Sequence, residues 1–431
     1  MNILRYPDQR DYADIMKRPV VAAVDMSTIV DTIFSDVVQY GDEALIRYTK
    51  QYDGVALSRI LLPAEALEAA ADLISNELKE AIRLAADNIR RFHAAQQLVI
   101  RKIETTPGVL CWQEARGIER VGIYIPGGTA PLFSTVLMLA IPAVLAGCRE
   151  IVLCTPPGAD GSIHPAICYA ASVAGVHKIA AVGGVQAIAA LTFGTDSIPA
   201  VYKIFGPGNQ YVAAAKQKAL SLGVAIDLPA GPSELLVVAD ETAVPAYVAA
   251  DLLSQAEHGP DSQVICLSDR EEVLLRIAEE VDKQCQGLPR KNIVRSALQQ
   301  SSLVLLSDRE AIMDFVNRYA PEHLILCTRD NEYYRGEVIN AGSVFLGNYT
   351  PESAGDYASG TNHTLPTNGA ARAYGGVSLD TFVKKITFQE ITPAGLQSIG
   401  KTIETMAEAE GLQAHKQAVS IRIADLNNNQ A

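Results

Sequence analysis

The sequence of 431 residues lacks several features that would place it in a familiar class of proteins. Positive charge is not in excess: the net charge is −13, so a nucleic acid is not expected as a partner. The longest apolar run, Val136 to Cys148, is too short to cross a bilayer and contains Pro142, so no membrane segment is expected. The opening residues MNILRYPDQRDYADIMKRP contain no long apolar core; we therefore expect no signal peptide and a cytoplasmic protein.

Cysteine pairs with metal-binding or redox spacing are also missing. No two cysteines form a Cys-x-x-Cys motif, and none lies in a Gly-rich or His-flanked turn, so neither a thiolate zinc site nor a catalytic cysteine is indicated. Most lie in apolar surroundings such as EIVLCTPP and SQVICLSD, which favours reduced core residues. The seven cysteines are Cys111, Cys148, Cys154, Cys168, Cys266, Cys285 and Cys327.

Strand and helix patterns alternate through most of the chain. Apolar residues at three-and-four spacing predict helices over about the first hundred residues, and from about Val121 short apolar strands alternate with helices. A second alternating series begins at ELLVVADETA. Alternation of this kind predicts an α/β fold with two doubly wound, Rossmann-like parallel-sheet domains facing a cleft, with small helical segments at both ends of the chain.

Glycine-rich loops follow several of the predicted strands. The dinucleotide fingerprint G-x-G-x-x-G is absent, because GPGNQY has Tyr211 at the last glycine position. The loops Gly127-Gly128, Gly183-Gly184 and Gly206-Pro207-Gly208 nevertheless follow strands, where doubly wound sheets bind ligands. Each loop alone is explained by turn chemistry. Three such loops at one sheet edge are as well explained by a nucleotide-binding site as by ordinary turns.

Histidine is scarce, with seven residues, so the surroundings of each are informative. In LLSQAEHGPDSQ, Gln255 and His258 lie three apart at the end of a predicted helix, which Gly259-Pro260 terminates. Helix capping explains this pair, since an imidazole interacts well with a helix C-terminus. The alternative is a metal site of nitrogen and oxygen ligands completed by Asp356 and His415, but their separation in sequence leaves convergence undetermined.

Two further segments carry candidate chemistry. Glu322 and His323, in YAPEHLIL, pair a carboxylate with an imidazole at a strand edge, which suits proton transfer. The structural interpretation is a helix-end acid beside a partly buried histidine. From about Thr350, the segment TPESAGDYASGTNHTLPTNGAARAYGG is rich in Asp, His and Tyr, which is typical of a binding loop rather than a linker.

Several motifs in order closely resemble the histidinol dehydrogenase family. They are YIPGGTAPLFSTVLM, VGGVQAIAAL, FGPGNQYV, PAGPSELLVVAD, DLLSQAEHGPDSQ, YAPEHL and SAGDYASGTNHTLPT. The resemblance covers nearly the whole chain. It implies an NAD-dependent homodimer with one zinc ion per subunit, which oxidises L-histidinol through L-histidinaldehyde to L-histidine. Two NAD molecules and one water would be used in these last steps of histidine biosynthesis.

The resemblance also implies roles for particular residues. The zinc ligands would be Gln255, His258, Asp356 and His415, and the acid–base pair would be Glu322 and His323. Substrate contacts would come from Ser233 and Glu410, together with the zinc ligands and His323. The NAD contacts would be Tyr124, Gln186 and Asn209, in or beside loops that follow predicted strands.

The domain organisation that we predict is an N-terminal arm, two α/β domains and a helical tail. The arm is residues 1–20, the first α/β domain is 21–122 with 234–378, the second is 123–233, and the tail is 379–431. We expect the tail to reach the partner subunit, because Phe382, Val383 and Ile386 need a surface to bury them. A tail that folds back on its own chain is the alternative.

Two other functions compete with the resemblance. The chain could be a relative that oxidises another amino alcohol or a diol. The sequence retains all four positions of the family's zinc ligands, which argues against this function because the zinc serves to bind the imidazole of histidinol. An inactive metal- or nucleotide-binding module is the second alternative, and the intact Glu322-His323 pair argues against it.

Overall fold

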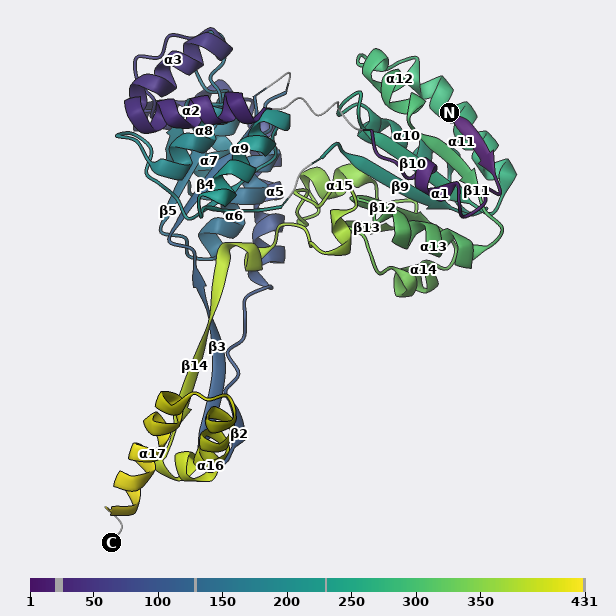
Figure 1. Cartoon of the computed structure of the whole chain (residues 1–431). Coiled ribbons are helices and arrows are strands. Elements are labelled where there is room, and N and C mark those ends of the chain that lie inside the picture. Colours follow the sequence, from purple (N-terminus) through teal and green to yellow (C-terminus); the bar gives the residue numbers. More distant parts are fainter. Residues whose placement is uncertain (20–25, 128–129, 229–230, 429–431) are drawn as a thin grey trace. The chain divides into compact units, whose positions relative to one another are not determined.

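The computed structural model describes residues 1–19, 26–127, 130–228 and 231–428. The chain forms two compact units, each built from two separate stretches of sequence (Figure 1). The first unit is Met1–Gln96 with Ile118–Phe382, and the second is Gln97–Gly117 with Val383–Ala431.

The first unit contains a six-stranded sheet in which every strand runs parallel to its neighbours, in the order β1-β11-β10-β9-β12-β13. Its strands are β1 (Asn2–Arg5), β9 (Glu234–Ala239), β10 (Gln263–Ser268), β11 (Ser302–Leu305), β12 (His323–Cys327) and β13 (Ser343–Leu346). The helices of this part are α1 (Tyr12–Ile15), α10 (Pro245–Ala256), α11 (Glu271–Cys285), α12 (Lys291–Gln299), α13 (Arg309–Tyr319), α14 (Asn331–Glu337) and α15 (Glu352–Tyr357). Two short 3₁₀ turns follow, η2 (Ala370–Arg372) and η3 (Leu379–Phe382).

Strand β9 shows why this sheet needs helices on both faces. All six of its residues are buried. Leu235 and Val237 pack with α10, α11 and α12, whereas Leu236 and Val238 pack with α1 and α13 on the opposite face. Successive side chains of a strand point to opposite faces, so a continuous apolar run is what a doubly covered parallel strand requires.

The first unit also contains a five-stranded parallel sheet, in the order β6-β5-β4-β7-β8. Its strands are β4 (Arg120–Tyr124), β5 (Glu150–Cys154), β6 (Lys178–Ala180), β7 (Lys203–Phe205) and β8 (Ala225–Ile226). The surrounding helices are α2 (Ser27–Tyr40), α3 (Asp42–Asp53), α4 (Ala64–Ala69), η1 (Ala70–Leu73), α5 (Asn76–Ala94), α6 (Phe133–Leu145), α7 (Pro165–Ala174), α8 (Gly184–Phe193) and α9 (Gln210–Ser221). The predicted α/β fold with parallel sheets is therefore confirmed.

The N-terminal helices pack differently from the prediction, which grouped residues 21–122 with 234–378. Helix α2 buries Val30 and Ile33 in one cluster with Ile188 of α8, and α5 buries Ile82 and Ile89 against the other face of the five-stranded sheet. An amphipathic pattern shows that a helix has an apolar face but does not say which sheet covers it. The predicted boundary at residue 21 lies outside the described residues.

The N-terminal arm, predicted over residues 1–20, contains a strand that the sequence patterns did not reveal. Asn2–Arg5 forms β1 and pairs with Ser302–Leu305 at an edge of the six-stranded sheet. Tyr12 then packs against Phe315 of α13, with ring centroids 5.0 Å apart. Within the described residues, the arm is therefore part of the first unit's fold.

The second unit contains an antiparallel sheet in the order β14-β3-β2 and two helices. Its elements are β2 (Ile103–Thr106), β3 (Val109–Gly117), β14 (Val383–Ile391), α16 (Pro393–Ala409) and α17 (Gln413–Asn428). The prediction of a mostly helical tail is wrong at its start, because β14 pairs with β3 at nine successive positions (Figure 1). Most of β14 is exposed, so its sequence does not alternate between apolar and polar residues.

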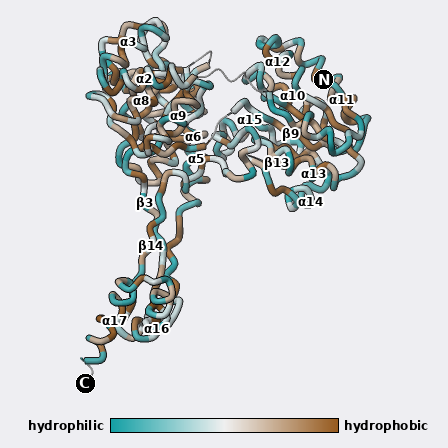
Figure 2. The backbone as a smooth tube through the Cα atoms, in the orientation of Figure 1, coloured by the Kyte–Doolittle hydropathy of each residue, from teal (hydrophilic) through white to brown (hydrophobic). Residues whose placement is uncertain are grey.

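Hydrophobic residues are spread through both units rather than gathered in one long segment (Figure 2). Among the described residues, no helix has both the length and the apolar character needed to cross a membrane.

Candidate functional site

The Glu322-His323 pair is placed by an unusual helix end. Helix α13 ends at Tyr319, and Ala320 adopts a left-handed conformation with φ of 53°, uncommon for a residue other than glycine. The chain passes through Pro321 to Glu322, and His323 is the first residue of β12. This turn brings both side chains to the amino edge of the six-stranded sheet.

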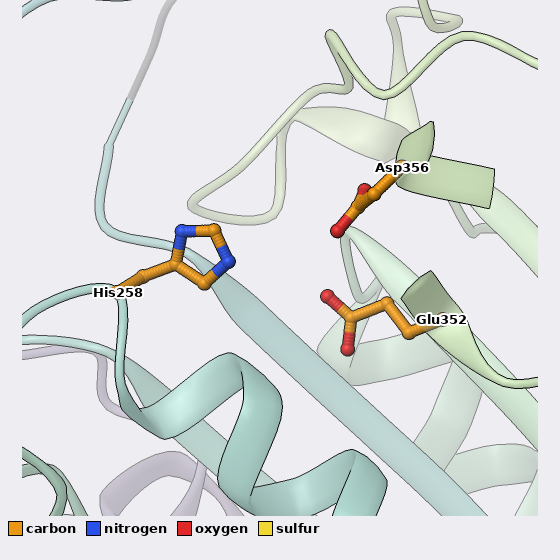
Figure 3. Close-up of side chains that lie close together, drawn as sticks. All are labelled: His258, Glu352 and Asp356. Carbon is orange, nitrogen blue, oxygen red and sulfur yellow. The ribbon is translucent and has the colours of Figure 1, made fainter. Parts of the chain in front are cut away.

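A second group of side chains comes from the end of α10 and from α15. His258 lies two residues beyond the end of α10, while Glu352 and Asp356 lie four apart on α15 and so share one face. Figure 3 shows the imidazole and the two carboxylates pointing toward one another. One ligand atom from each lies within 4.8 Å of the others, a spacing that allows a shared metal ion.

His323 lies among acceptors on both sides of its ring. Its Nδ1 is 3.3 Å from the carbonyl oxygen of Glu234, 3.6 Å from Oε2 of Glu322 and 3.7 Å from Oε1 of Glu352. Its Nε2 is 3.9 Å from Oδ1 of Asp356. The backbone carbonyl favours a proton on Nδ1, which leaves Nε2 as the nitrogen that can exchange a proton with a ligand.

Charge and burial act in opposite directions on this cluster. Burial alone would lower the pKa of His323, but Glu322, Glu352 and Asp356 together raise it to about 10. Burial raises the pKa of Glu352 well above its usual value, although His323 partly offsets this effect. The cluster therefore holds more negative groups than one imidazolium balances, which favours a bound cation.

Gln255 lies in the last turn of α10, and its amide is buried. One of its two orientations directs the nitrogen to Oε1 of Glu352 and the oxygen to the backbone N–H of Glu234, 3.0 Å away. This orientation satisfies both amide atoms. Gln255 therefore belongs to the same polar cluster as His323, as well as lying one turn from His258.

These side chains line a cavity of 330 Å³. The cavity walls include residues from the loops of both parallel sheets of the first unit. Among the predicted site residues, it is lined by Asn209, Ser233, Gln255, His258, Glu322, His323 and Asp356. Imidazoles, amides and carboxylates thus surround a space suited to a small polar molecule.

A larger cavity of 1090 Å³ lies at the carboxyl ends of the five-stranded sheet, and it is lined by Tyr124, Gln186 and Asn209. The Tyr124 hydroxyl accepts a hydrogen bond from the N–H of Gly184 at 3.2 Å. Asn209 caps α9 by accepting from the N–H groups of Tyr211 and Val212. Capping uses only the amide oxygen of Asn209, which leaves its nitrogen for a ligand. Gly128, in the first glycine-rich loop, lies outside the described residues.

The glycine loop after β7 is held by a buried ion pair. Lys216 pairs with Asp227 and donates to the carbonyl of Gly206 at 2.9 Å, while Asp227 accepts from the Gly206 N–H at 2.7 Å. Both backbone polar groups of Gly206 are thus occupied. Gly206 has φ of 122°, and a Cβ there would meet the carbonyl oxygen of Tyr124 at 1.9 Å, so only glycine fits. This loop leads to Asn209, which lines both cavities.

Comparison with known proteins identifies the family. The family model of histidinol dehydrogenase matches residues 16–423. The chain belongs to the histidinol dehydrogenase family. Histidinol dehydrogenase from Bacteroides thetaiotaomicron is 56% identical over 426 residues, which cover 99% of this chain and 100% of that protein. The chloroplastic histidinol dehydrogenase of Arabidopsis thaliana is 50% identical, covering 96% of this chain and 90% of that protein.

Solved structures agree with the assignment to the histidinol dehydrogenase family. The structure of histidinol dehydrogenase from Elizabethkingia anophelis has a TM-score of 0.98 and 57% identity, and the match covers 99% of each chain. The resemblance seen in the sequence motifs is therefore confirmed at the level of the family and the fold.

Two residues with roles implied by the histidinol dehydrogenase motifs belong to the second unit. Glu410 follows the last residue of α16, and His415 lies in the first turn of α17. Both are exposed. The predicted roles of Glu410 as a substrate contact and His415 as a zinc ligand stay predictions.

Glu352 is the residue that the sequence interpretation missed. It lies in the quoted binding segment, four residues before Asp356, and this i,i+4 spacing on a helix would have indicated two carboxylates on one face. One of its oxygens, Oε2, is buried with no hydrogen-bond partner among the described residues. An oxygen in this state favours a cation ligand.

Proposed function

We propose that the protein oxidises L-histidinol through L-histidinaldehyde to L-histidine, with two NAD molecules as hydride acceptors and one water as the source of oxygen. The observation that carries this proposal is the convergence of the Glu322-His323 pair and the His258, Glu352 and Asp356 side chains on one cavity. A second cavity, with which it shares Asn209, is large enough for a dinucleotide. Membership of the histidinol dehydrogenase family supports the choice of substrate.

The donor set fits a zinc ion. Imidazole nitrogen and carboxylate or amide oxygen are borderline and hard donors, which suit Zn²⁺, and the unpartnered Oε2 of Glu352 adds negative charge beside them. In this proposal Gln255, His258 and Asp356 hold one zinc per subunit, together with His415. When bound, zinc would anchor and orient the imidazole and amino groups of the substrate.

His323 serves both oxidations as the proton acceptor. Contact with the Glu234 carbonyl keeps its proton on Nδ1 and leaves Nε2 toward the substrate. Nε2 takes the hydroxyl proton of histidinol as the first hydride leaves, and a proton of the aldehyde hydrate before the second hydride leaves. A bound divalent cation would offset the carboxylates that raise the His323 pKa, so the imidazole would be neutral and able to act as a base.

Glu322 acts chiefly in the second oxidation, which is the step that needs water. Its Oε2 accepts a hydrogen bond from the N–H of Glu234 at 2.9 Å, which fixes the carboxylate in the cavity wall. A fixed carboxylate at this position takes a proton from water as its oxygen attacks the aldehyde carbon. Ser233 and Glu410 complete the substrate contacts.

The dinucleotide occupies the larger cavity, with Tyr124, Gln186 and Asn209 as contacts. When bound, NAD would accept the hydride. The buried Oε1 of Gln186 lacks a hydrogen-bond partner among the described residues, and the Asn209 nitrogen is not used in capping, so both have capacity for a polar ligand.

The active enzyme in this proposal is a cytoplasmic homodimer, and the partner subunit supplies His415 and Glu410. The second unit supports this idea because large apolar side chains stay exposed on it. They are Leu98, Val99, Ile100, Ile103, Ile386, Ile391, Met406, Leu412 and Ile421. Such a surface gains burial by association with a second copy of the chain.

An absorbance assay of NADH formation tests the proposed function. We expect NADH to form with L-histidinol and NAD, to form far more slowly with a simple diol, and to stop when zinc is removed by a chelator. Equal turnover of the diol would instead indicate a general alcohol dehydrogenase. Absence of turnover with zinc and NAD present would indicate a binding module.

A further inference from the structure

The larger cavity has a chemical character that its predicted NAD contacts do not explain. Among its described lining residues there is no lysine or arginine, whereas two aspartates, Asp53 and Asp160, are present. A cavity that takes a dinucleotide must hold a pyrophosphate and two riboses. The aspartates can accept hydrogen bonds from ribose hydroxyl groups but would repel phosphate.

The two aspartates differ in whether their oxygens are satisfied. Asp160 lies in an exposed turn, where both of its oxygens accept from the Ser162 hydroxyl at 2.8 Å. Asp53, the last residue of α3, has its Oδ2 buried with no hydrogen-bond partner among the described residues. A buried carboxylate oxygen without a donor is costly in a folded protein, and Asp53 lies in the cavity wall, so it is the carboxylate that gains by turning toward a ligand.

The surroundings of Asp53 suit an adenosine. Tyr52 and Ile29 line the same cavity, and both leave much of their apolar surface exposed, at 55% and 39%. A flat ring and an aliphatic side chain form a surface against which a purine can stack. Gly54, in a left-handed conformation, ends α3 directly after Asp53 and so holds the carboxylate at the helix end.

The position of the nicotinamide follows from the other cavity. Pro126 and Asn209 line both cavities, so hydride transfer to the dinucleotide must take place near them. Ile29, Tyr52 and Asp53 line only the larger cavity. A dinucleotide with its nicotinamide beside Asn209 therefore extends its adenosine into the part of the cavity that belongs to α2 and α3.

We propose that Asp53 selects NAD over NADP by accepting hydrogen bonds from the adenosine ribose hydroxyls, with the adenine against Tyr52 and Ile29. This inference rests on the proposed NAD-dependent function. The 2′-phosphate of NADP removes one hydroxyl donor and places further negative charge beside a carboxylate, with no lysine or arginine among the described lining residues to offset it.

The test compares dinucleotide binding and turnover in Asp53→Asn, an isosteric change, with Asp282→Asn as the matched control, since Asp282 is exposed on α11 and lines neither cavity. Calorimetry with NAD and with NADP measures each affinity, and histidinol oxidation gives the ratio of kcat/KM for the two cofactors. For Asp53→Asn we expect about a 10- to 100-fold loss of NAD affinity, the effect of losing hydrogen bonds to a charged group. We also expect at least a tenfold fall in the preference for NAD. Asp282→Asn should change neither value by more than about twofold.

Tyr52→Ala gives a second, independent result. Loss of stacking should weaken the binding of NAD and of NADP to a similar degree, because the adenine is the same in both.

If the wild-type protein binds NAD and Asp53→Asn keeps the full preference for NAD, the role of Asp53 is overturned and the proposed function stands. If the wild-type protein binds neither dinucleotide, the proposed function itself fails. Thermal unfolding of each variant confirms that the comparison is between folded proteins, and Asp53→Ser replaces Asp53→Asn if the latter does not fold.

Discussion

The backbone N–H of Glu234 donates a hydrogen bond to Oε2 of Glu322 across 2.9 Å. The carbonyl oxygen of the same residue lies 3.3 Å from Nδ1 of His323. The first residue of β9 thus contacts both members of the proposed acid–base pair. The carboxylate of Glu234 is in turn held by a bidentate ion pair with Arg18, at 2.9 and 3.0 Å, so the position of the pair depends on the N-terminal arm.

Substitution of the acid–base pair should separate the two oxidations. Glu322→Gln keeps the shape of the side chain but cannot take a proton from water, so we expect a larger loss of aldehyde oxidation than of histidinol oxidation. His323→Asn should impair both by about a hundredfold or more, the usual weight of general base catalysis. The half-reactions are measured separately with histidinol and with histidinaldehyde as substrates. Equal losses of both half-reactions in Glu322→Gln would contradict the division of roles.

Removal of the Glu352 charge should weaken metal binding. Glu352→Gln preserves volume but removes one negative charge from the cluster with His258 and Asp356. We expect zinc affinity to fall by about 10- to 100-fold, the range seen when a group beside a metal is changed. Competition with a chromophoric chelator measures this affinity, and Glu337→Gln on the exposed surface of α14 is the control. An unchanged zinc affinity in Glu352→Gln would remove Glu352 from the metal site.

Asp251 should make stability depend on pH. Burial raises the pKa of this α10 carboxyl to about 6, although a hydrogen bond from the Glu352 backbone partly offsets the effect. The pKa of Asp251 is higher in the folded state than in the unfolded state, so folding is favoured when this carboxyl is protonated. The resulting contribution to the free energy of unfolding is lost as pH rises through about 6. Asp251→Asn should therefore raise the free energy of unfolding at pH 7.5, by at most about 3 kcal/mol, and should flatten its pH dependence.

Urea denaturation from about pH 4 to pH 8 measures this effect, and the apparent gain from Asp251→Asn should shrink toward pH 4. Destabilisation by Asp251→Asn at pH 7.5 would show that the charged carboxylate contributes favourably. That result would contradict a raised pKa of Asp251 in the folded state.

Mixed dimers test whether the second unit completes the site of its partner. Subunits carrying His415→Ala are combined with subunits carrying His258→Ala, after dissociation and reassociation. If His415 acts in trans, each mixed dimer has one intact site, so histidinol oxidation should reappear. If the tail serves its own chain, every site carries one defect and activity stays absent. Failure to recover activity in a proven heterodimer would rule out the trans arrangement.

Much of the fold follows from local patterns in the sequence. Helix α10 and strand β12 form where the apolar spacing predicted them, because burial on one or both faces leaves a clear periodicity. Strand β14 was missed because most of its residues are exposed and no alternation is required of them. The prediction also did not give the sheet against which α2 and α5 pack, since this depends on contacts between segments distant in sequence.

The candidate site was predicted from motifs rather than from geometry. His258 and Asp356 are almost a hundred residues apart, so no spacing rule could place them together, and only the fold brings them within reach of one ion. Glu352 lacked a motif-based role and was overlooked despite its spacing from Asp356. The position of the site, at the starts of β9 and β12, also differs from the carboxyl-edge rule for parallel sheets.

The most direct test of the proposed function is the number of NADH molecules formed from each molecule of L-histidinol. The zinc-loaded protein is given excess NAD and a limiting amount of L-histidinol, and absorbance is followed to completion. We expect two NADH per histidinol, with L-histidine as the only product and no free aldehyde. A yield of one NADH with accumulated aldehyde, or no NADH formation, would contradict the proposed two-step oxidation.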